Sequence, residues 1–374
     1  MTQSEYRNPV GKASLAGTQR REERALTPLP YGYIDSLRKI LAPGPNFRDW
    51  KWAQDSLGGE NDWQATDWFP VTEDQLAPND PDCVWRVRKR GSDQNDLIEM
   101  WSPVRWVALL VQLILPLRIF QIRMLDSGEA DTWRYEGGVW QRNRGPLAGG
   151  TERIPHCQGV FRRMAIPEDK VSTFFYINTN KTADAILSSK DKGYTLAWPK
   201  IDGTPFHRDV YYWLERLRNW QEKFNPIQRP TPWSVLDARH APLKSEIQIA
   251  GVPDTCFLFR LAEGRANETM LPLRDTHIRR PWHHLLEALE LQLAKTGPAH
   301  PNETPIRFVP IVTDRRSSAT FFPLHSLRVS LITSLALEGQ VPFPILRKIE
   351  GDSSILMTNY YTNHGNTQQA IEGL

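Results

Sequence analysis

The stretch HSLRVSLITSLALEGQ, residues 325–340, begins with two side chains that could bind an anion. His325 and Arg328 are three residues apart, and residues at that spacing are neighbours on one face of a helix. The residues that follow are apolar, which predicts a largely buried helix over residues 325–338. Two cationic groups on one face of such a helix indicate a site for an anion such as a phosphate.

The elements expected to position this pair are mostly helices. Helices are predicted over residues 33–41, 102–124, 207–224, 282–295, 325–338 and 343–349, with a break in the second at Pro116. The Gly-Gly pair in TWRYEGGVWQRN, residues 132–143, predicts a hairpin. β-Branched and aromatic residues predict strands in VSTFFYINTNKT, residues 171–182, and in YTLAWP, residues 194–199.

The string HSLRVSLITSLALEGQVPFPILRKIEGDSSILMTNYYT, residues 325–362, resembles the tyrosine recombinase (phage integrase) family. That family has a His-x-x-Arg pair, an apolar helix ending in Gly, a second short helix, and a Gly-His-Ser-Ser-Ile-like motif before a tyrosine. The tyrosine lies nine residues beyond the His or Trp of that motif. Asp352 occupies the His or Trp position here, so Tyr361 matches the tyrosine, with Tyr360 as the adjacent alternative.

Two further family positions lie upstream, in the family's order. In LILPLRIFQIRMLDSGEADT, Arg118 matches the first arginine, and Gln121 stands where the family usually has Glu. Lys181, in YINTNKTADA, matches a lysine carried by a β-hairpin. If the hairpin has a different register, the alternatives are Lys190, Lys192 and Lys200. The resemblance to the tyrosine recombinase family covers residues 102–363 and is strongest over residues 322–362, as in a divergent member of that family.

The resemblance implies cleavage and rejoining of duplex DNA without a metal or cofactor. Tyr361 is expected to attack a phosphodiester and form a 3′-phosphotyrosyl bond, which conserves the bond energy for rejoining. Arg118 and Arg328 are expected to hold the non-bridging oxygens and stabilise the transition state. The implied roles of Lys181 and His325 are to protonate the departing 5′ oxygen and to assist proton transfer at the nucleophile.

Asp352 is the main departure from the family pattern. The family residue at that position donates a hydrogen bond to the scissile phosphate, and an ionised carboxylate cannot donate. Asp352 therefore points away, is protonated, or is replaced as donor by a residue such as His364; otherwise activity is weak or lost. The separation of 207 residues between Arg118 and His325 is also longer than is usual in the family.

The resemblance and the predicted elements together imply an α+β fold, mostly helical, like a tyrosine recombinase catalytic domain with a small antiparallel sheet. Residues 1–101 are expected to form a polar lead-in and a partial or divergent DNA clamp. Residues 102–374 are expected to form the catalytic domain, with an insertion at about 226–310 that accounts for the long separation.

Charge, cysteine spacing and the lengths of apolar runs exclude some classes of protein but do not identify one. The formal charge of +3 permits a nucleic-acid partner but does not demand one. Cys83, Cys157 and Cys256 are widely spaced, which argues against a disulfide framework or a zinc site. The N-terminal residues contain no apolar leader, and the apolar run at residues 106–117 is too short to cross a bilayer. We therefore expect a cytoplasmic protein associated with a bacterial-type nucleoid.

The predicted function is site-specific DNA recombination or integration of the mobile-genetic-element type. The expected partners are duplex DNA and further copies of the chain on that DNA, with other recombinase subunits as an option and no membrane. Two alternatives stay open: a degenerate member that binds DNA without cutting it, and a type IB topoisomerase-like enzyme. His277, His283 and His284 do not predict a metal site, because adjacent histidines on a helix point about 100° apart and no Cys or carboxylate partner has suitable spacing.

Overall fold

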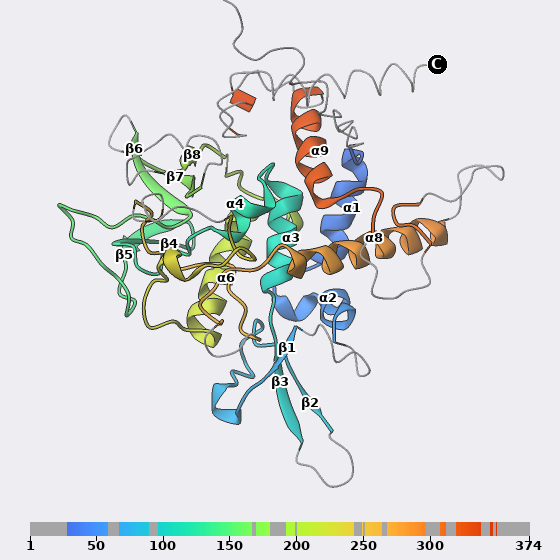
Figure 1. Cartoon of the computed structure of the whole chain (residues 1–374), viewed down its shortest axis with the longest axis horizontal. Helices are drawn as coiled ribbons and strands as arrows, with labels where there is room; N and C mark the ends of the chain where they lie inside the picture. The colour runs from blue at the N-terminus through green and yellow to red at the C-terminus, as the bar shows by residue number, and fades with distance from the viewer. Residues whose placement is uncertain are drawn as a thin grey trace, which may run out of the picture.

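The protein folds around one central helix, α3, with small antiparallel sheets on two sides of the helical core (Figure 1). The computed structural model describes residues 28–58, 67–89, 96–166, 170–179, 192–198, 200–242, 249, 251–263, 268–296, 307–311, 319–337, 345–346 and 349. In these ranges, no helix has the length and apolar character needed to span a bilayer.

The helix α3, Val104–Ile114, is apolar around most of its circumference, and all of its residues are buried. A helix of this kind has to be covered on every side. It is covered by α1 (Tyr31–Leu41), α4 (Ile119–Arg123), α6 (Val210–Phe224), α8 (Thr276–Thr296) and α9 (Leu324–Leu337). Segments from both ends of the described chain therefore meet at α3 (Figure 1).

The helix α1 is amphipathic and also carries a buried cation. Ile34, Leu37 and Leu41 are fully buried on its inner face. Arg38 lies among them, and its Nε donates to the carbonyl oxygen of Leu113 at 2.9 Å. Because the last carbonyls of a helix lack partners within the helix, this bond caps the end of α3 and attaches α1 to it.

A cluster of four aromatic side chains joins the N-terminal region to α6. Phe47, Trp50, Trp101 and Trp213 are all fully buried, and the rings of Trp50 and Trp213 pack edge to face with centroids 4.6 Å apart. Trp50 immediately precedes the short helix α2, Lys51–Ser56. Residues before and after position 101 therefore share one core, and the domain boundary predicted there stays a prediction.

The strands form three small antiparallel sheets within the described part of the chain. In the first, β3 (Leu97–Trp101) lies between β1 (Trp68–Pro70) and β2 (Trp85–Arg88). The second is the hairpin of β4 (Trp133–Glu136) and β5 (Val139–Arg142). In the third, β7 (Lys170–Ile177) lies between β6 (Phe161–Ile166) and β8 (Tyr194–Leu196).

The predicted element types are confirmed where the structure describes them. The α+β class is confirmed, as are the break at Pro116 and the predicted hairpin, whose turn residues Gly137 and Gly138 have φ of +57° and +86°. The helix predicted over residues 325–338 is α9. The predicted helix at 343–349 falls mostly outside the described residues.

The stretch 226–310, predicted as an insertion, contributes directly to the main core. Its helix α8 begins at Thr276, six residues before the predicted start, and has Pro281 in its interior. Trp282, Leu285 and Leu289 of α8 are buried in the same cluster as α3. The insertion stays a prediction, but this helix packs against α1 and α3 as a structural part of the fold.

The buried face of α9 gives a direct stability test. Leu327 is fully buried in the main core, whereas Leu291 on α8 is 65% exposed. We expect Leu327→Ala to lower the free energy of unfolding by about 2–5 kcal/mol, because it removes buried apolar surface and leaves a cavity. The control Leu291→Ala should change it by less than about 0.5 kcal/mol. Urea unfolding measures both, and equal effects would contradict the packing of α9.

Candidate active site

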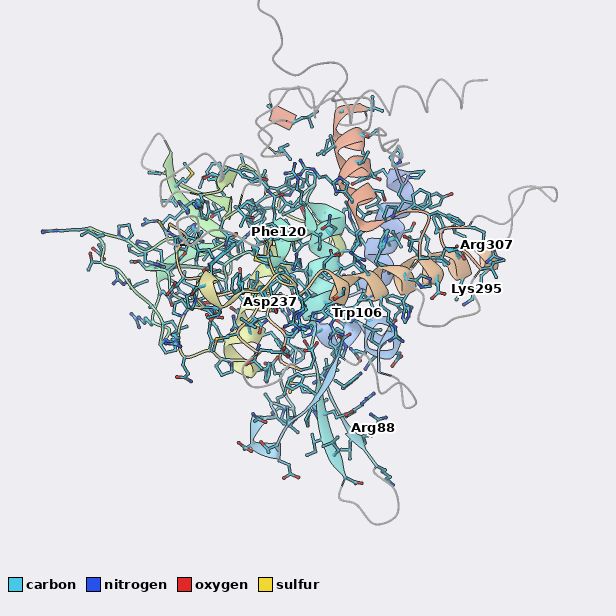
Figure 2. The ribbon with its side chains drawn as sticks, in the orientation of Figure 1. Arg88, Trp106, Phe120, Asp237, Lys295 and Arg307 are labelled. Carbon is cyan, nitrogen blue, oxygen red and sulfur yellow. The ribbon has the colours of Figure 1, made fainter. Side chains whose placement is uncertain are left out.

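The predicted first arginine lies in the break between α3 and α4. α3 ends at Ile114, and Arg118 takes the N-cap position of α4. The backbone N–H of Arg118 donates to Oε1 of Gln121 at 2.9 Å, and its side chain is partly exposed. Phe120, labelled in Figure 2, marks this short helix beside α3. The break thus fixes the backbone of Arg118, whose side chain is partly exposed with Nη1 buried.

The side chain of Gln121 joins this break to the end of β7. Gln121 is 1% exposed, and its Nε2 donates to the carbonyl oxygen of Thr179 at 3.2 Å. The next residue back reinforces the link, because Nδ2 of Asn178 donates to the carbonyl of Met124 at 2.5 Å. A side-chain amide can accept from Arg118 and donate to Thr179 at once, whereas an ionised Glu cannot donate. The geometry therefore explains why Gln suits this position.

The buried Arg328 joins α9 to the same break. Its side chain is 0% exposed, and Nη1 donates to the carbonyl oxygen of Pro116 at 2.7 Å, across a sequence separation of 212 residues. Pro116 is two residues before Arg118. Desolvating a guanidinium is costly unless its donors find acceptors, so this bond restricts how α9 can sit against α3.

His325 and Arg328 differ in burial although they share α9. His325 is exposed in the first turn of the helix, whereas Arg328 is fully enclosed. The predicted helix is confirmed, but the prediction that both cations lie together on one face is not, because His325 faces solvent and Arg328 is held in the protein interior. Both residues begin the helix that packs against α3.

Of the four candidate lysines, the structure describes Lys192 and Lys200. Lys181 lies two residues beyond Thr179 and outside the described residues, as does Lys190. Lys200 donates from Nζ to the hydroxyl of Tyr135 at 2.8 Å, which attaches it to the β4–β5 hairpin. Lys192 is 5% exposed, and its carbonyl accepts from the hydroxyl of Tyr176.

The C-terminal motif residues lie outside the part of the chain that the structure describes. These are Asp352, Tyr360, Tyr361 and His364. Their roles stay predictions. Of the nine candidate site residues, the structure therefore places Arg118, Gln121, His325 and Arg328, and it links the segments that carry them.

A residue that the sequence did not single out holds α4 from its other end. Arg123 is 5% exposed, and its Nη1 donates to the carbonyls of Leu273 at 2.7 Å and His240 at 3.1 Å. Burial lowers the pKa of Arg123 to about 10, which leaves it charged at neutral pH. No local pattern signals this role, because both acceptors are more than a hundred residues away.

Asp126, just after α4, is a buried anchor rather than an exposed acid. Its carboxylate accepts from the backbone N–H of Gly128 at 2.7 Å and of Cys256 at 2.8 Å. Burial, together with the nearby negative charge of Asp131, raises the pKa of Asp126 to about 7. This contact ties residues around 256 to the segment that follows the candidate site.

One group of potential metal ligands gathers within the described ranges, and it lies on α8 rather than on α4 or α9. It consists of His283, His284 and Glu287. The candidate active site is built instead from cations and an amide, which suits an anionic ligand.

Comparison with known families agrees with the general class that these cations indicate. A family described as "Putative integrase" matches residues 1–234, and the chain belongs to this family. The match includes the positions of Arg118, Gln121 and Lys181 and ends before α9. It places the protein in DNA integration and recombination in general. No curated protein and no solved structure matches the chain.

The double role of Gln121 can be tested by an isosteric change. We expect Gln121→Met to lower the free energy of unfolding by about 1–3 kcal/mol, because it leaves the Thr179 carbonyl and the Arg118 N–H without this partner. Amide hydrogen exchange at Arg118 should also become faster. Gln141→Met, at an exposed position of β5, is the control and should have little effect. Unchanged exchange at Arg118 in the first variant would contradict the assigned bonds.

Proposed function

We propose that this integrase-family chain is a tyrosine recombinase, which cleaves and rejoins duplex DNA through a 3′-phosphotyrosyl intermediate. Tyr361 is the proposed nucleophile, and Arg118, Lys181, His325 and Arg328 are the proposed groups that act on the scissile phosphate. The family match supports DNA integration in general. The tyrosine mechanism is the finer proposal.

The observation that carries the proposal is the hydrogen bond from Arg328 to the carbonyl of Pro116. It connects the helix that bears the His-x-x-Arg pair to a carbonyl two residues from Arg118. The bond from Gln121 to Thr179 adds the end of β7 to the same place. Lys181 follows Thr179 by two residues, which limits the separation of their Cα atoms to about 7 Å. If the motif matches were due to chance, the segments that carry them would not be expected to lie next to one another in the fold.

Besides the covalent bond that Tyr361 forms with the phosphate, the proposed chemistry requires the protein to stabilise charge on that phosphate. The transition state of phosphoryl transfer carries negative charge on its non-bridging oxygens, and guanidinium groups match that geometry with paired N–H donors. Arg328 is enclosed in the structure, so its guanidinium has to become accessible when DNA binds, and its bond to Pro116 holds it beside the backbone break that carries Arg118. Lys181 supplies the proton to the departing 5′ oxygen, and the exposed His325 assists proton transfer at Tyr361.

Duplex DNA is the proposed substrate, and several copies of the chain are proposed to act together on it, because strand exchange needs more than one cleavage. A recombinase and a type IB topoisomerase-like enzyme would share this chemistry. Relaxation of supercoiled plasmid by a monomer would favour the second. A cytoplasmic location at the nucleoid is part of the same proposal.

Asp352 favours one alternative of a different kind. A carboxylate at a position that contacts the scissile phosphate would repel it, so a chain that binds DNA without cutting it is the second candidate. Both candidates require binding that weakens steeply with salt, because phosphate contacts release counterions. The absence of any salt-dependent DNA binding would exclude both of them.

Covalent trapping tests the nucleophile. The protein is incubated without metal with a pool of nicked duplexes whose central sequence is randomised, and adducts that survive denaturant are recovered. We expect an adduct with the wild-type chain and with Tyr360→Phe, and none with Tyr361→Phe. An adduct that persists in Tyr361→Phe would contradict the assignment. Binding without any adduct would instead support the non-cleaving alternative.

The two arginines should separate structural from catalytic effects. We expect Arg118→Ala and Arg328→Ala each to abolish the adduct. Only Arg328→Ala should also lower the free energy of unfolding by about 1–3 kcal/mol, because it strips the buried Pro116 carbonyl of its bond. The partly exposed Arg118 should contribute below about 1 kcal/mol. Adduct yield and urea unfolding measure the two effects, and full adduct yield in either variant would contradict the proposed phosphate contacts.

A further inference from the structure

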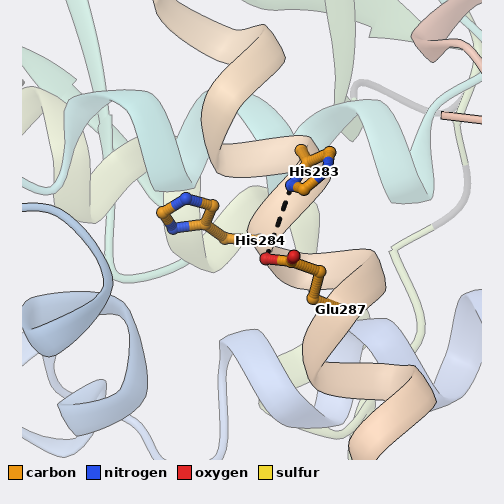
Figure 3. Close-up of side chains that lie close together, drawn as sticks. All are labelled: His283, His284 and Glu287. Carbon is orange, nitrogen blue, oxygen red and sulfur yellow. Dashed lines mark ion pairs between the residues drawn. The ribbon is translucent and has the colours of Figure 1, made fainter. Parts of the chain in front are cut away.

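We propose that α8 carries a binding site for a divalent transition-metal cation of the zinc class, formed by His283, His284 and Glu287. The site is separate from the proposed DNA chemistry, which needs no metal. Its three side chains come from adjacent turns of one helix (Figure 3).

The geometry brings the three donor groups to one place. One ligand atom from each residue lies within 4.8 Å of the other two. Nδ1 of His283 and Oε2 of Glu287 are 3.4 Å apart, and Figure 3 shows the carboxylate turned back along the helix toward the imidazoles. Metal–ligand bonds of about 2.1 Å place tetrahedral ligands about 3.4 Å apart, so small side-chain rotations complete the set.

One ring nitrogen of His284 is held by a backbone carbonyl. Its Nδ1 is 3.0 Å from the carbonyl oxygen of Ser56, and because a carbonyl only accepts, this nitrogen must carry the proton. The lone pair is therefore on Nε2. Metal-binding histidines usually have their second nitrogen held by such an acceptor.

His283 provides a second, independent observation that indicates a bound cation. It is 4% exposed, and neither of its ring nitrogens makes a hydrogen bond. Nδ1 lies 3.4 Å from the Glu287 carboxylate without forming a hydrogen bond, and a buried polar group whose hydrogen bonds are not made requires an explanation. A cation between His283 and Glu287 satisfies one nitrogen and brings a positive charge to the carboxylate.

The donor set selects the class of metal. Two imidazoles and one carboxylate suit zinc and its neighbours, whereas magnesium and calcium prefer oxygen ligands throughout. Three protein ligands leave a fourth position for water. The side chain of Glu287 is 48% exposed, so a cation can reach the site from solvent. The nearby charge of Arg280 opposes binding, and the carboxylate of Glu287 offsets it.

The sequence pattern predicted no metal here, because adjacent histidines diverge around a helix and no Cys or carboxylate was judged to have suitable spacing. The second reason was wrong for Glu287, which lies one turn beyond both histidines and gathers with them. The carboxylate at that spacing is what allows the two diverging rings to share a ligand. Through Ser56, the site also connects α8 to the end of α2.

The experiment uses the full chain, with any histidine tag removed, titrated with Co²⁺ and with Zn²⁺. We expect one equivalent of Co²⁺ to give the visible absorption of a tetrahedral site, which Zn²⁺ then displaces. Glu287→Gln and His284→Ala should each weaken Zn²⁺ binding tenfold or more, since even indirect partners of metal ligands contribute about 10–100-fold. Zinc should also raise the melting temperature of the wild-type chain.

The matched control is Glu73→Gln, which removes one exposed carboxylate far along the chain in a short 3₁₀ helix. It should bind Zn²⁺ like the wild type. Equal affinity in Glu287→Gln, His284→Ala and the control would overturn the proposal, as would the absence of stoichiometric binding by the wild type. DNA cleavage plays no part in the readout, so this test stands or fails separately from the proposed recombinase activity.

Discussion

The hydrogen bond between Arg328 and the carbonyl of Pro116 is the contact on which the rest of the account depends. Proline stops α3 and leaves a stretch of backbone whose carbonyls have no partner in that helix. A guanidinium buried at the start of α9 supplies the donor. Because a buried charge tolerates few arrangements, the bond restricts how α9 can approach α3. The same constraint keeps Arg328 near Arg118, as a shared phosphate site requires.

The scaffold around this contact is continuous rather than modular. Arg38 caps the end of α3 from the N-terminal side, and Arg123 attaches α4 to residues 240 and 273. In each case an arginine buried at least nine-tenths donates to backbone carbonyls that lie far away in the sequence. The protein thus uses cations to satisfy the ends of helices in its interior. The candidate phosphate site is built from similar parts, with Arg118 left partly exposed.

Local patterns predicted most of the helices and some of the strands, but not how distant elements meet. Apolar periodicity predicted α6, an apolar run predicted α9 and the Gly-Gly turn predicted the β4–β5 hairpin, whereas β1, β2, β3 and β6 were not predicted. The start of α8 was missed, because Pro281 normally marks a helix boundary and here lies inside the helix. The place of α8 in the main core was missed for a different reason, since contacts between residues 276–296 and α3 leave no local signal.

The candidate site shows the same division. The family resemblance supplied Arg118, Lys181, His325 and Arg328 as candidates, and their roles stay predictions. The burial of Arg328 beside an exposed His325 could not be predicted, because it depends on the Pro116 carbonyl 212 residues away. Gln121 was predicted as a mild departure from Glu, and its two opposite hydrogen-bonding roles emerged only when the end of β7 was located next to it.

The most direct test of the account is a crystal structure of the Tyr361→Phe variant bound to the duplex recovered by covalent trapping. We expect the scissile phosphate to lie within hydrogen-bond distance of the guanidinium groups of both Arg118 and Arg328, with Arg328 still bonded to Pro116. A phosphate that contacts neither arginine, or DNA bound to a face away from α4 and α9, would contradict it.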